Sequence, residues 1–148
     1  MVSRVIPVDA FDLVIFGGTG DLARRKILPG LFRRFLAGQM PENARIIGAA
    51  RSELDAAGYR QMIAEAVAEF GGEESKNKKG LDAFLECLDY VAIDARGTGG
   101  WAELAKMVRS DVIQAFYFSV APSLFGDLAE RLHTNNISTA KSRIVVEK

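Results

Sequence analysis

Short apolar segments typical of β-strands alternate with longer segments of helical periodicity along this chain of 148 residues. We predict five strands, at residues 11–16, 44–50, 88–94, 112–121 and 143–146. In the connections between them, apolar residues recur every three or four positions, which predicts a helix in each. Strands joined through helices pair in parallel with right-handed crossovers. The sequence therefore predicts an α/β domain built on a doubly wound parallel sheet.

Two of the connections carry signals that mark where their helices begin and end. Pro29 lacks an N–H and should kink the first helix or restart it near residue 29, and Gly38 should end it. The second helix matches the amphipathic template throughout residues 59–70, with Ser52 or Asp55 as its N-cap.

The segment 71–80 contains no large apolar residue and several charges, so we predict a solvated, mobile loop there. A short helix is predicted to follow at 81–85, and Pro122 should begin the last helix.

Composition excludes several classes of protein. Nineteen Lys and Arg balance nineteen Asp and Glu, so there is no overall charge to favour nucleic acid or an anionic membrane, and any anion site must be local. Cys87 and His133 are the single cysteine and histidine, which leaves neither an internal disulfide nor a Cys/His metal cluster. No apolar stretch is long enough to span a bilayer or to act as a signal peptide. We expect a soluble, cytoplasmic protein whose residues 1–148 form one domain.

The turn after the first strand has the pattern of a nucleotide-binding loop. Gly18, Gly20 and Ala23 form G-x-G-x-x-A directly between a strand and a helix. A side chain at Gly18 or Gly20 would hold the backbone away from a pyrophosphate, and the helix N-terminus would supply free N–H groups. We therefore predict a Rossmann-like dinucleotide-binding domain, with cofactor contacts from Gly17, Gly18, Thr19, Gly20, Asp21, Leu22 and Ala23. The alternative is a tight turn with no ligand.

The end of the second predicted strand indicates which dinucleotide is bound. An NAD-selective domain usually has Asp or Glu here to accept hydrogen bonds from the ribose 2′-hydroxyl, but this chain has Arg51 followed by Ser52. A guanidinium can bind a 2′-phosphate and stack on adenine, so Arg51 predicts NADP, with Ser52 as a second donor. Glu53 is a competing carboxylate that lies two residues further on, and a merely exposed arginine is the alternative.

Other candidates have simpler explanations. Arg24 and Arg25 fit a solvated basic face, whereas Lys26 fits either that face or a bound phosphate, because a helix N-terminus disfavours positive charge without a nearby anion. His133 is predicted to face solvent near a helix end, and Cys87 to be a small buried hydrophobic residue. No tyrosine is followed four residues later by lysine, which argues against a short-chain reductase mechanism.

Four motifs, in order, resemble the glucose-6-phosphate dehydrogenase family over residues 10–148: G-G-T-G-D-L-A-R-R-K, A-A-R-S-E-L, F-Y-F-S-V-A-P-S and V-V-E-K. The resemblance implies oxidation of glucose 6-phosphate to 6-phosphoglucono-1,5-lactone with NADP, the first step of the pentose phosphate pathway. It matches Gly17, Gly20, Asp21, Leu22 and Ala23 to the family's glycine loop, Arg51 to the arginine that takes the 2′-phosphate, Lys26 to the lysine near the loop, Pro122 to the nicotinamide-side proline, and Lys148 to a lysine that contacts the sugar near the nicotinamide.

The resemblance also implies what these residues lack. The family's second domain, with its histidine general base, most of the sugar-phosphate site and the surface that forms homo-oligomers, lies beyond Lys148. We therefore expect an amino-terminal portion with no catalytic residue of its own and weak or absent dehydrogenase activity alone. The alternative is a non-catalytic module that binds or senses NADPH. Nucleic-acid binding through the basic residues 24–34 has little support, because net charge is zero and no aromatic platform accompanies them.

Overall fold

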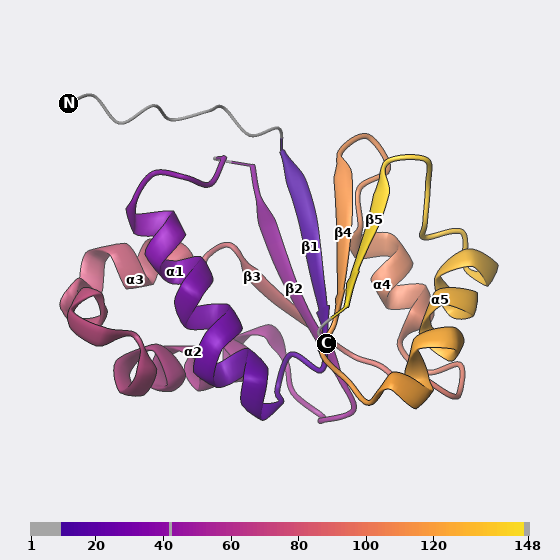
Figure 1. The fold of residues 1–148 in the computed structure, drawn as a ribbon, viewed down its shortest axis with the longest axis horizontal. Helices are drawn as coiled ribbons and strands as arrows, with labels where there is room; N and C mark the ends of the chain where they lie inside the picture. Colours follow the sequence, from indigo (N-terminus) through magenta and orange to yellow (C-terminus); the bar gives the residue numbers. More distant parts are fainter. Residues whose placement is uncertain (1–9, 42, 147–148) are drawn as a thin grey trace.

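The computed structural model describes residues 10–41 and 43–146, and in them the predicted α/β architecture is confirmed. Five strands form one parallel sheet in the order β3-β2-β1-β4-β5 (Figure 1). Their bounds are Phe11–Phe16 for β1, Arg45–Ala50 for β2, Leu88–Ala92 for β3, Ile113–Phe118 for β4 and Ser142–Val146 for β5. The register aligns the central strand with both neighbours, since Val14 lies opposite Ile47 of β2 and Phe116 of β4.

Helices cover both faces of the sheet, as a doubly wound fold requires. The α-helices α1 (Leu28–Leu36), α2 (Ala56–Phe70) and α3 (Lys78–Leu85) lie on one side, and α4 (Trp101–Met107) and α5 (Phe125–Thr134) on the other (Figure 1). Asp55, and not Ser52, caps α2, because its carboxylate accepts the Gly58 N–H at 2.7 Å. In the part of the chain that the structure describes, no helix is long and apolar enough to cross a membrane.

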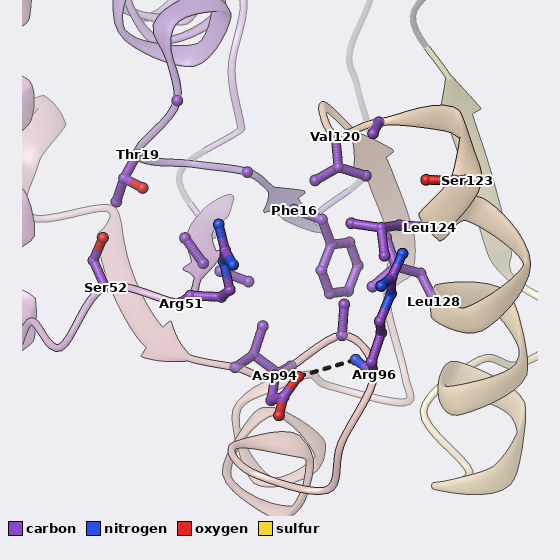
Figure 2. Close-up of a pocket in the computed structure, with 17 residues that line it drawn as sticks. Phe16, Thr19, Arg51, Ser52, Asp94, Arg96, Val120, Ser123, Leu124 and Leu128 are labelled. Atoms are coloured by element: carbon purple, nitrogen blue, oxygen red, sulfur yellow. Dashed lines mark hydrogen bonds between the residues drawn. The ribbon is translucent and has the colours of Figure 1, made fainter.

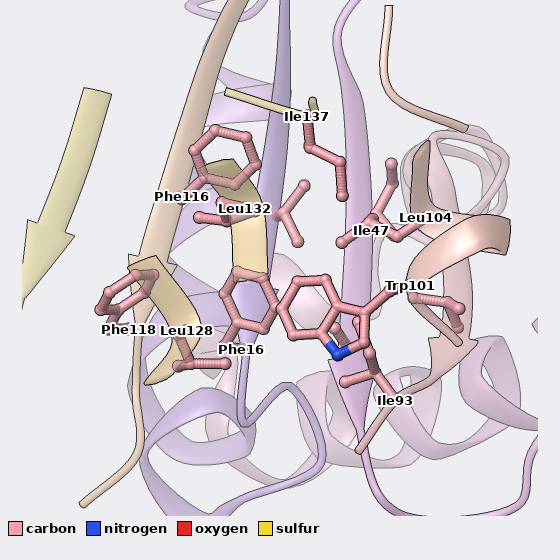
Figure 3. Packing of buried hydrophobic residues seen from close by; sticks show 13 residues of the cluster. Phe16, Ile47, Ile93, Trp101, Leu104, Phe116, Phe118, Leu128, Leu132 and Ile137 are labelled. Atoms are coloured by element: carbon pink, nitrogen blue, oxygen red, sulfur yellow. The ribbon is translucent and has the colours of Figure 1, made fainter. Parts of the chain in front are cut away.

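Each face of the sheet has its own hydrophobic core. On the side of α4 and α5, Phe16 packs against Trp101 and Phe118, with ring centroids 5.8 and 5.5 Å apart (Figure 3). On the side of α1 to α3, Tyr59 and Phe84 are completely buried. Because β1 contributes to both cores, the turn that follows it is fixed from two sides.

Pro29 lies in the first turn of α1, directly after a π-helical turn. Residues Ala23–Ile27 form a π-helical turn, in which the Leu28 N–H donates to the Ala23 carbonyl, and α1 then begins with Pro29 in its first turn. The prediction that the helix restarts near residue 29 is confirmed. The restart follows a π-helical turn and not a kink at the proline. A π-turn tolerates the missing Pro29 N–H because it shifts the hydrogen-bond register by one residue.

The prediction of a loop at 71–80 is wrong in its structure. Residues Gly72–Lys76 form a 3₁₀ helix and α3 begins at Lys78, where the Asn77 side chain accepts the Gly80 N–H at 2.8 Å. Most of the segment is exposed, as predicted from its charges, and its mobility stays a prediction. The start of α3 could not be predicted from apolar residues, because a side-chain cap and not burial defines it.

At the amino ends of the strands, a buried carboxylate pairs with a half-buried arginine, an ion pair that the sequence did not predict. Asp12 of β1 is completely buried, and its carboxylate accepts hydrogen bonds from both the backbone N–H and the guanidinium of Arg109, the latter at 2.7 Å. Arg109 also donates to the Asn43 carbonyl at 2.6 Å. This cluster ties β1 to the segments that precede β2 and β4, at the end of the sheet opposite to the candidate site.

Candidate functional site

The carboxyl ends of the strands surround a cavity of about 800 Å³ (Figure 2). It lies at the switch point between β1 and β4, from which the following helices leave to opposite faces of the sheet. Crevices at this position are where open α/β sheets bind ligands. The residues that line it are Phe16, Gly17, Thr19, Gly20, Ala49, Ala50, Arg51, Ser52, Ile93, Asp94, Ala95, Arg96, Val120, Ala121, Ser123, Leu124 and Leu128.

Gly17 turns the chain sharply at the end of β1. Its φ is +85°, and an added Cβ would lie against the backbone carbonyl oxygen of Ser119. The Gly17 N–H donates to the Ala49 carbonyl at 2.8 Å, and the Gly17 carbonyl accepts the Gly20 N–H at 2.9 Å. Only glycine fits this position, because both the left-handed backbone and the contact with the β4 turn exclude a side chain.

Gly18 packs against α2, and its predicted contact with the cofactor stays a prediction. It is buried beneath the turn, where an added Cβ would lie 2.9 Å from the Tyr59 hydroxyl and 3.0 Å from the Gly48 Cα. The Tyr59 hydroxyl donates to the Gly18 carbonyl at 3.0 Å. Burial is the main cause that raises the pKa of Tyr59, and the nearby Tyr90 raises it further. Gly18 therefore allows the turn to pack on α2. Gly20 faces the cavity, and there only the Gly17 carbonyl would be near an added Cβ.

Arg51 and Ser52 stand at the cavity mouth, on the turn after β2. This turn is held by Tyr90 of β3, whose hydroxyl contacts the Ser52 carbonyl at 2.7 Å and the Ala50 carbonyl at 3.2 Å. Desolvation is the main cause that raises the pKa of Tyr90, the charge of Glu53 raises it further, and the hydrogen bond with Ser52 lowers it. Because the pKa is raised overall, the hydroxyl stays protonated and a donor at neutral pH. Arg51 is exposed, and among the residues described here none pairs with its guanidinium.

Several predicted cofactor residues lie outside the cavity. Asp21 is exposed and forms an ion pair with Arg25 at 2.7 Å. Ala23 is completely buried against the α1 to α3 core, which anchors the start of the helix. Lys26 and Pro122 are exposed, although the neighbours of Pro122, Ala121 and Ser123, line the cavity. Leu22 is half-buried, and Lys148 falls outside the described residues.

Sequence reasoning singled out no individual residue of the turn after β3, which forms one wall of the cavity. The third and fourth strands end at Ala92 and Phe118, earlier than predicted, so Asp94, Arg96 and Val120 belong to turns and line the cavity. The pattern did mark 94–100 as a turn through Gly97, Gly99 and Gly100. Nothing in it indicated that Arg96 reaches the cavity, because that depends on the conformation of the turn.

The cavity fits a dinucleotide. One side offers the glycine turn and the start of a helix, where backbone N–H groups can meet phosphate oxygens without interference from a side chain at Gly17 or Gly20. Arg51 supplies a cation at the mouth, and Ile93, Leu124 and Leu128 supply an apolar wall. A mainly apolar cleft with a few polar groups is typical of cofactor sites.

Comparison with known proteins agrees with this geometry. The family model described as "Glucose-6-phosphate dehydrogenase, NAD binding domain" matches residues 14–148. This chain belongs to that family. Its cofactor is therefore a nicotinamide dinucleotide, and the resemblance found in the four motifs is confirmed.

Individual relatives give the same result. The glucose-6-phosphate 1-dehydrogenase of Rhizobium meliloti is 42% identical over 150 residues, which cover 100% of this chain and 30% of the relative. The corresponding enzyme of Gluconobacter oxydans is 40% identical, with 95% and 30% covered. The crystal structure of the Mycobacterium avium enzyme superposes with a TM-score of 0.85 at 29% identity, over 95% of this chain and 30% of that one. The chain thus spans about 30% of the length of these relatives.

The lone histidine and cysteine lie apart from the cavity. His133 is exposed in the last turn of α5, as predicted. Cys87 is half-buried, whereas it was predicted to be buried. Desolvation is the main cause that raises the pKa of its thiol, and the charge of Glu86 raises it further. A thiol with a raised pKa has little thiolate at neutral pH, which is the opposite of what a nucleophile needs.

Proposed function

We propose that this chain is the coenzyme-binding part of an NADP-dependent glucose-6-phosphate dehydrogenase, which oxidises glucose 6-phosphate to 6-phosphoglucono-1,5-lactone. Family membership and the names of the relatives support the reaction. A similar solved structure, with a TM-score of 0.78 and 27% identity over 99% of this chain, is titled a glucose-6-phosphate dehydrogenase in complex with its substrate glucose-6-phosphate.

One observation carries the choice of NADP: Arg51 stands at the end of β2 beside the cavity, exposed and without a protein partner among the described residues. At this position a carboxylate would bind the ribose hydroxyls of NAD, whereas a guanidinium can form a bidentate contact with a 2′-phosphate. Ser52 and Thr19 line the same side of the cavity and offer hydroxyl donors. When bound, NADP accepts a hydride at its nicotinamide ring.

The residues described here bind and orient the cofactor. The start of the helix after the glycine turn offers backbone N–H groups, Tyr90 holds the turn that carries Arg51, and Ala121 and Ser123 form part of the wall on the segment after β4. Hydride transfer also needs a base to take the hydroxyl proton of the sugar and a donor carbon held close to the acceptor. We propose that both are supplied by parts of the enzyme outside residues 1–148. The family's Lys148 contact with the sugar, a homo-oligomeric state and a cytoplasmic location stay predictions.

Titration of NADP and NAD against the wild-type chain and an Arg51→Ala variant tests the proposal. A charged contact with the 2′-phosphate contributes about 1.5–3 kcal/mol, so NADP affinity should fall roughly tenfold to a hundredfold while NAD affinity changes little. Arg34→Ala, an exposed position on α1, is the matched control and should bind both cofactors as the wild type does. Equal wild-type affinity for both cofactors, unchanged in Arg51→Ala, would remove Arg51 from this role.

A further inference from the structure

We infer that Tyr90 is a positioning residue: its hydroxyl holds the backbone that carries Arg51 and thereby sets the preference of the site for a dinucleotide with a 2′-phosphate. This role rests on the proposed function, because it acts through the contact proposed there for Arg51. Tyr90 lies on β3, at the edge of the sheet, and is not among the residues that line the cavity. Neither the sequence motifs nor the family resemblance pointed to it.

The backbone around Arg51 has few hydrogen bonds of its own. β2 ends at Ala50, and among the described residues neither Arg51 nor Ser52 takes part in a backbone–backbone hydrogen bond. The Tyr90 hydroxyl lies 2.7 Å from the Ser52 carbonyl and 3.2 Å from the Ala50 carbonyl. A phenol has a single proton to donate, so the shorter bond is the stronger one. Tyr90 thus contacts the carbonyl groups on both sides of Arg51.

Tyr90 is itself held firmly in the core. It is 6% exposed, and its ring centroid lies 5.0 Å from that of Tyr59, which is completely buried on α2. Aromatic rings packed in this way have little room to move. The Tyr59 hydroxyl donates to the Gly18 carbonyl at 3.0 Å. The two packed rings therefore support the two turns beside the cavity, Tyr59 the glycine turn and Tyr90 the turn of Arg51.

The position of the backbone matters because the Arg51 side chain has no other support. It is exposed, and among the described residues no ion pair or hydrogen bond holds its guanidinium. A bidentate contact with a phosphate needs two N–H groups in place at once, and a long side chain loses more entropy on binding when its backbone also moves. NAD has no 2′-phosphate and gains nothing from this contact. The Tyr90 hydroxyl therefore favours NADP over NAD without touching either.

Calorimetric titrations of NADP and NAD test this role in Tyr90→Phe, which keeps the ring and its packing on Tyr59 but loses the hydroxyl. Tyr59→Phe is the matched control, because it loses a hydroxyl bond of the same kind to the glycine turn, which both cofactors share. Arg51→Ala and the double variant Tyr90→Phe/Arg51→Ala complete a double-mutant cycle. Thermal melts of each variant check that it is folded at the temperature of the titration.

Loss of one hydrogen bond predicts that Tyr90→Phe weakens NADP binding roughly three- to tenfold, while NAD affinity stays within twofold of the wild type. The ratio of NADP to NAD affinity should fall by the same factor, and it should stay near the wild-type value in Tyr59→Phe. In the Arg51→Ala background, Tyr90→Phe should have no further effect on NADP binding, because the side chain that it positions is absent.

A purely structural role for Tyr90 gives a different pattern. An unchanged ratio in Tyr90→Phe would overturn the inference, and so would an equal loss of NADP affinity with and without Arg51. An equal fall of the ratio in Tyr59→Phe would also overturn it, since general loosening would then explain both variants. If Arg51→Ala loses the preference for NADP and Tyr90→Phe keeps it, only the role of Tyr90 fails. If the wild-type chain binds neither cofactor, the proposed function fails as well.

Discussion

The two ends of the sheet use arginine in opposite ways. At the amino end, Arg109 lies against the completely buried carboxylate of Asp12 and donates to the backbone carbonyls of Phe11 and Asn43. At the carboxyl end, Arg51 is exposed and unpaired among the described residues, and the Arg96 side chain is 69% exposed with one carboxylate at 4.0 Å. Paired charges at the amino end stabilise the fold, whereas the two arginines at the carboxyl end are largely exposed to solvent.

This difference predicts where stability and binding reside. Substitutions at the amino end should lower the free energy of unfolding and leave the intrinsic cofactor affinity of the folded protein unchanged. Arg51 and Arg96 should behave in the reverse manner, because exposed side chains with few contacts contribute little to folding.

Arg109→Met should have the largest effect. It leaves the Asp12 carboxylate buried without its cation, which costs about 3–5 kcal/mol when a buried ion pair loses one partner. Urea denaturation should show this loss, while NADP affinity measured well below the midpoint should stay within twofold of the wild type. Adding Asp12→Asn to this variant removes the buried charge and should recover part of the stability. A loss below 1 kcal/mol, or no recovery in the double variant, would contradict the stabilising role of this pair.

Gly17→Ala tests the turn at the carboxyl end. The left-handed backbone costs alanine about 1–2 kcal/mol, and the contact of the new methyl group with the Ser119 carbonyl adds about 1 kcal/mol or more. We expect about 3 kcal/mol in all, together with loss of NADP binding. Gly20→Ala is the matched control, because its methyl group would meet only the Gly17 carbonyl, at 3.1 Å. It should cost less than about 1 kcal/mol of stability but weaken NADP binding. Similar stability losses in the two variants would refute this distinction.

The sequence was sufficient to predict features that depend on local chemistry. The strand order along the chain, the glycine turn and Arg51 all follow from residue type and spacing, and each lies within a few residues of a predicted strand. The start of α3 was missed because the side-chain cap of Asn77 outweighs the polar composition of the segment. The burial of Gly18 was missed because Tyr59, 41 residues away, occupies the space beneath it.

Features that depend on distant partners could not be predicted. Asp12 and Arg109 are 97 residues apart, and each looks like an ordinary surface charge in the sequence. The backbone position of Arg96 depends on Arg131, 35 residues later, which donates to the Arg96 carbonyl. A motif search detects positions where side chains must be absent, such as Gly17, more readily than positions where two polar side chains meet through the fold.

Tyr59→Phe should have the smallest effect at neutral pH and a distinctive dependence on pH. It removes the hydrogen bond to the Gly18 carbonyl, which contributes about 1 kcal/mol. Because burial raises the pKa of Tyr59 in the folded state, the wild type keeps its full stability below about pH 10, where the unfolded tyrosine ionises. Above that pH the unfolded state releases the proton and the folded state retains it. The wild type should therefore lose up to about 1.4 kcal/mol per pH unit, a loss that the phenylalanine variant lacks at this site.

The wild-type and Tyr59→Phe stability curves should consequently converge near pH 11. Urea denaturation from pH 8 to pH 11 measures both curves. Parallel curves would mean that the hydroxyl beneath the glycine turn can ionise in the folded protein. The carboxyl end of the sheet would then be open to solvent below its turn as well as above it, which would contradict the burial of Tyr59 beneath Gly18.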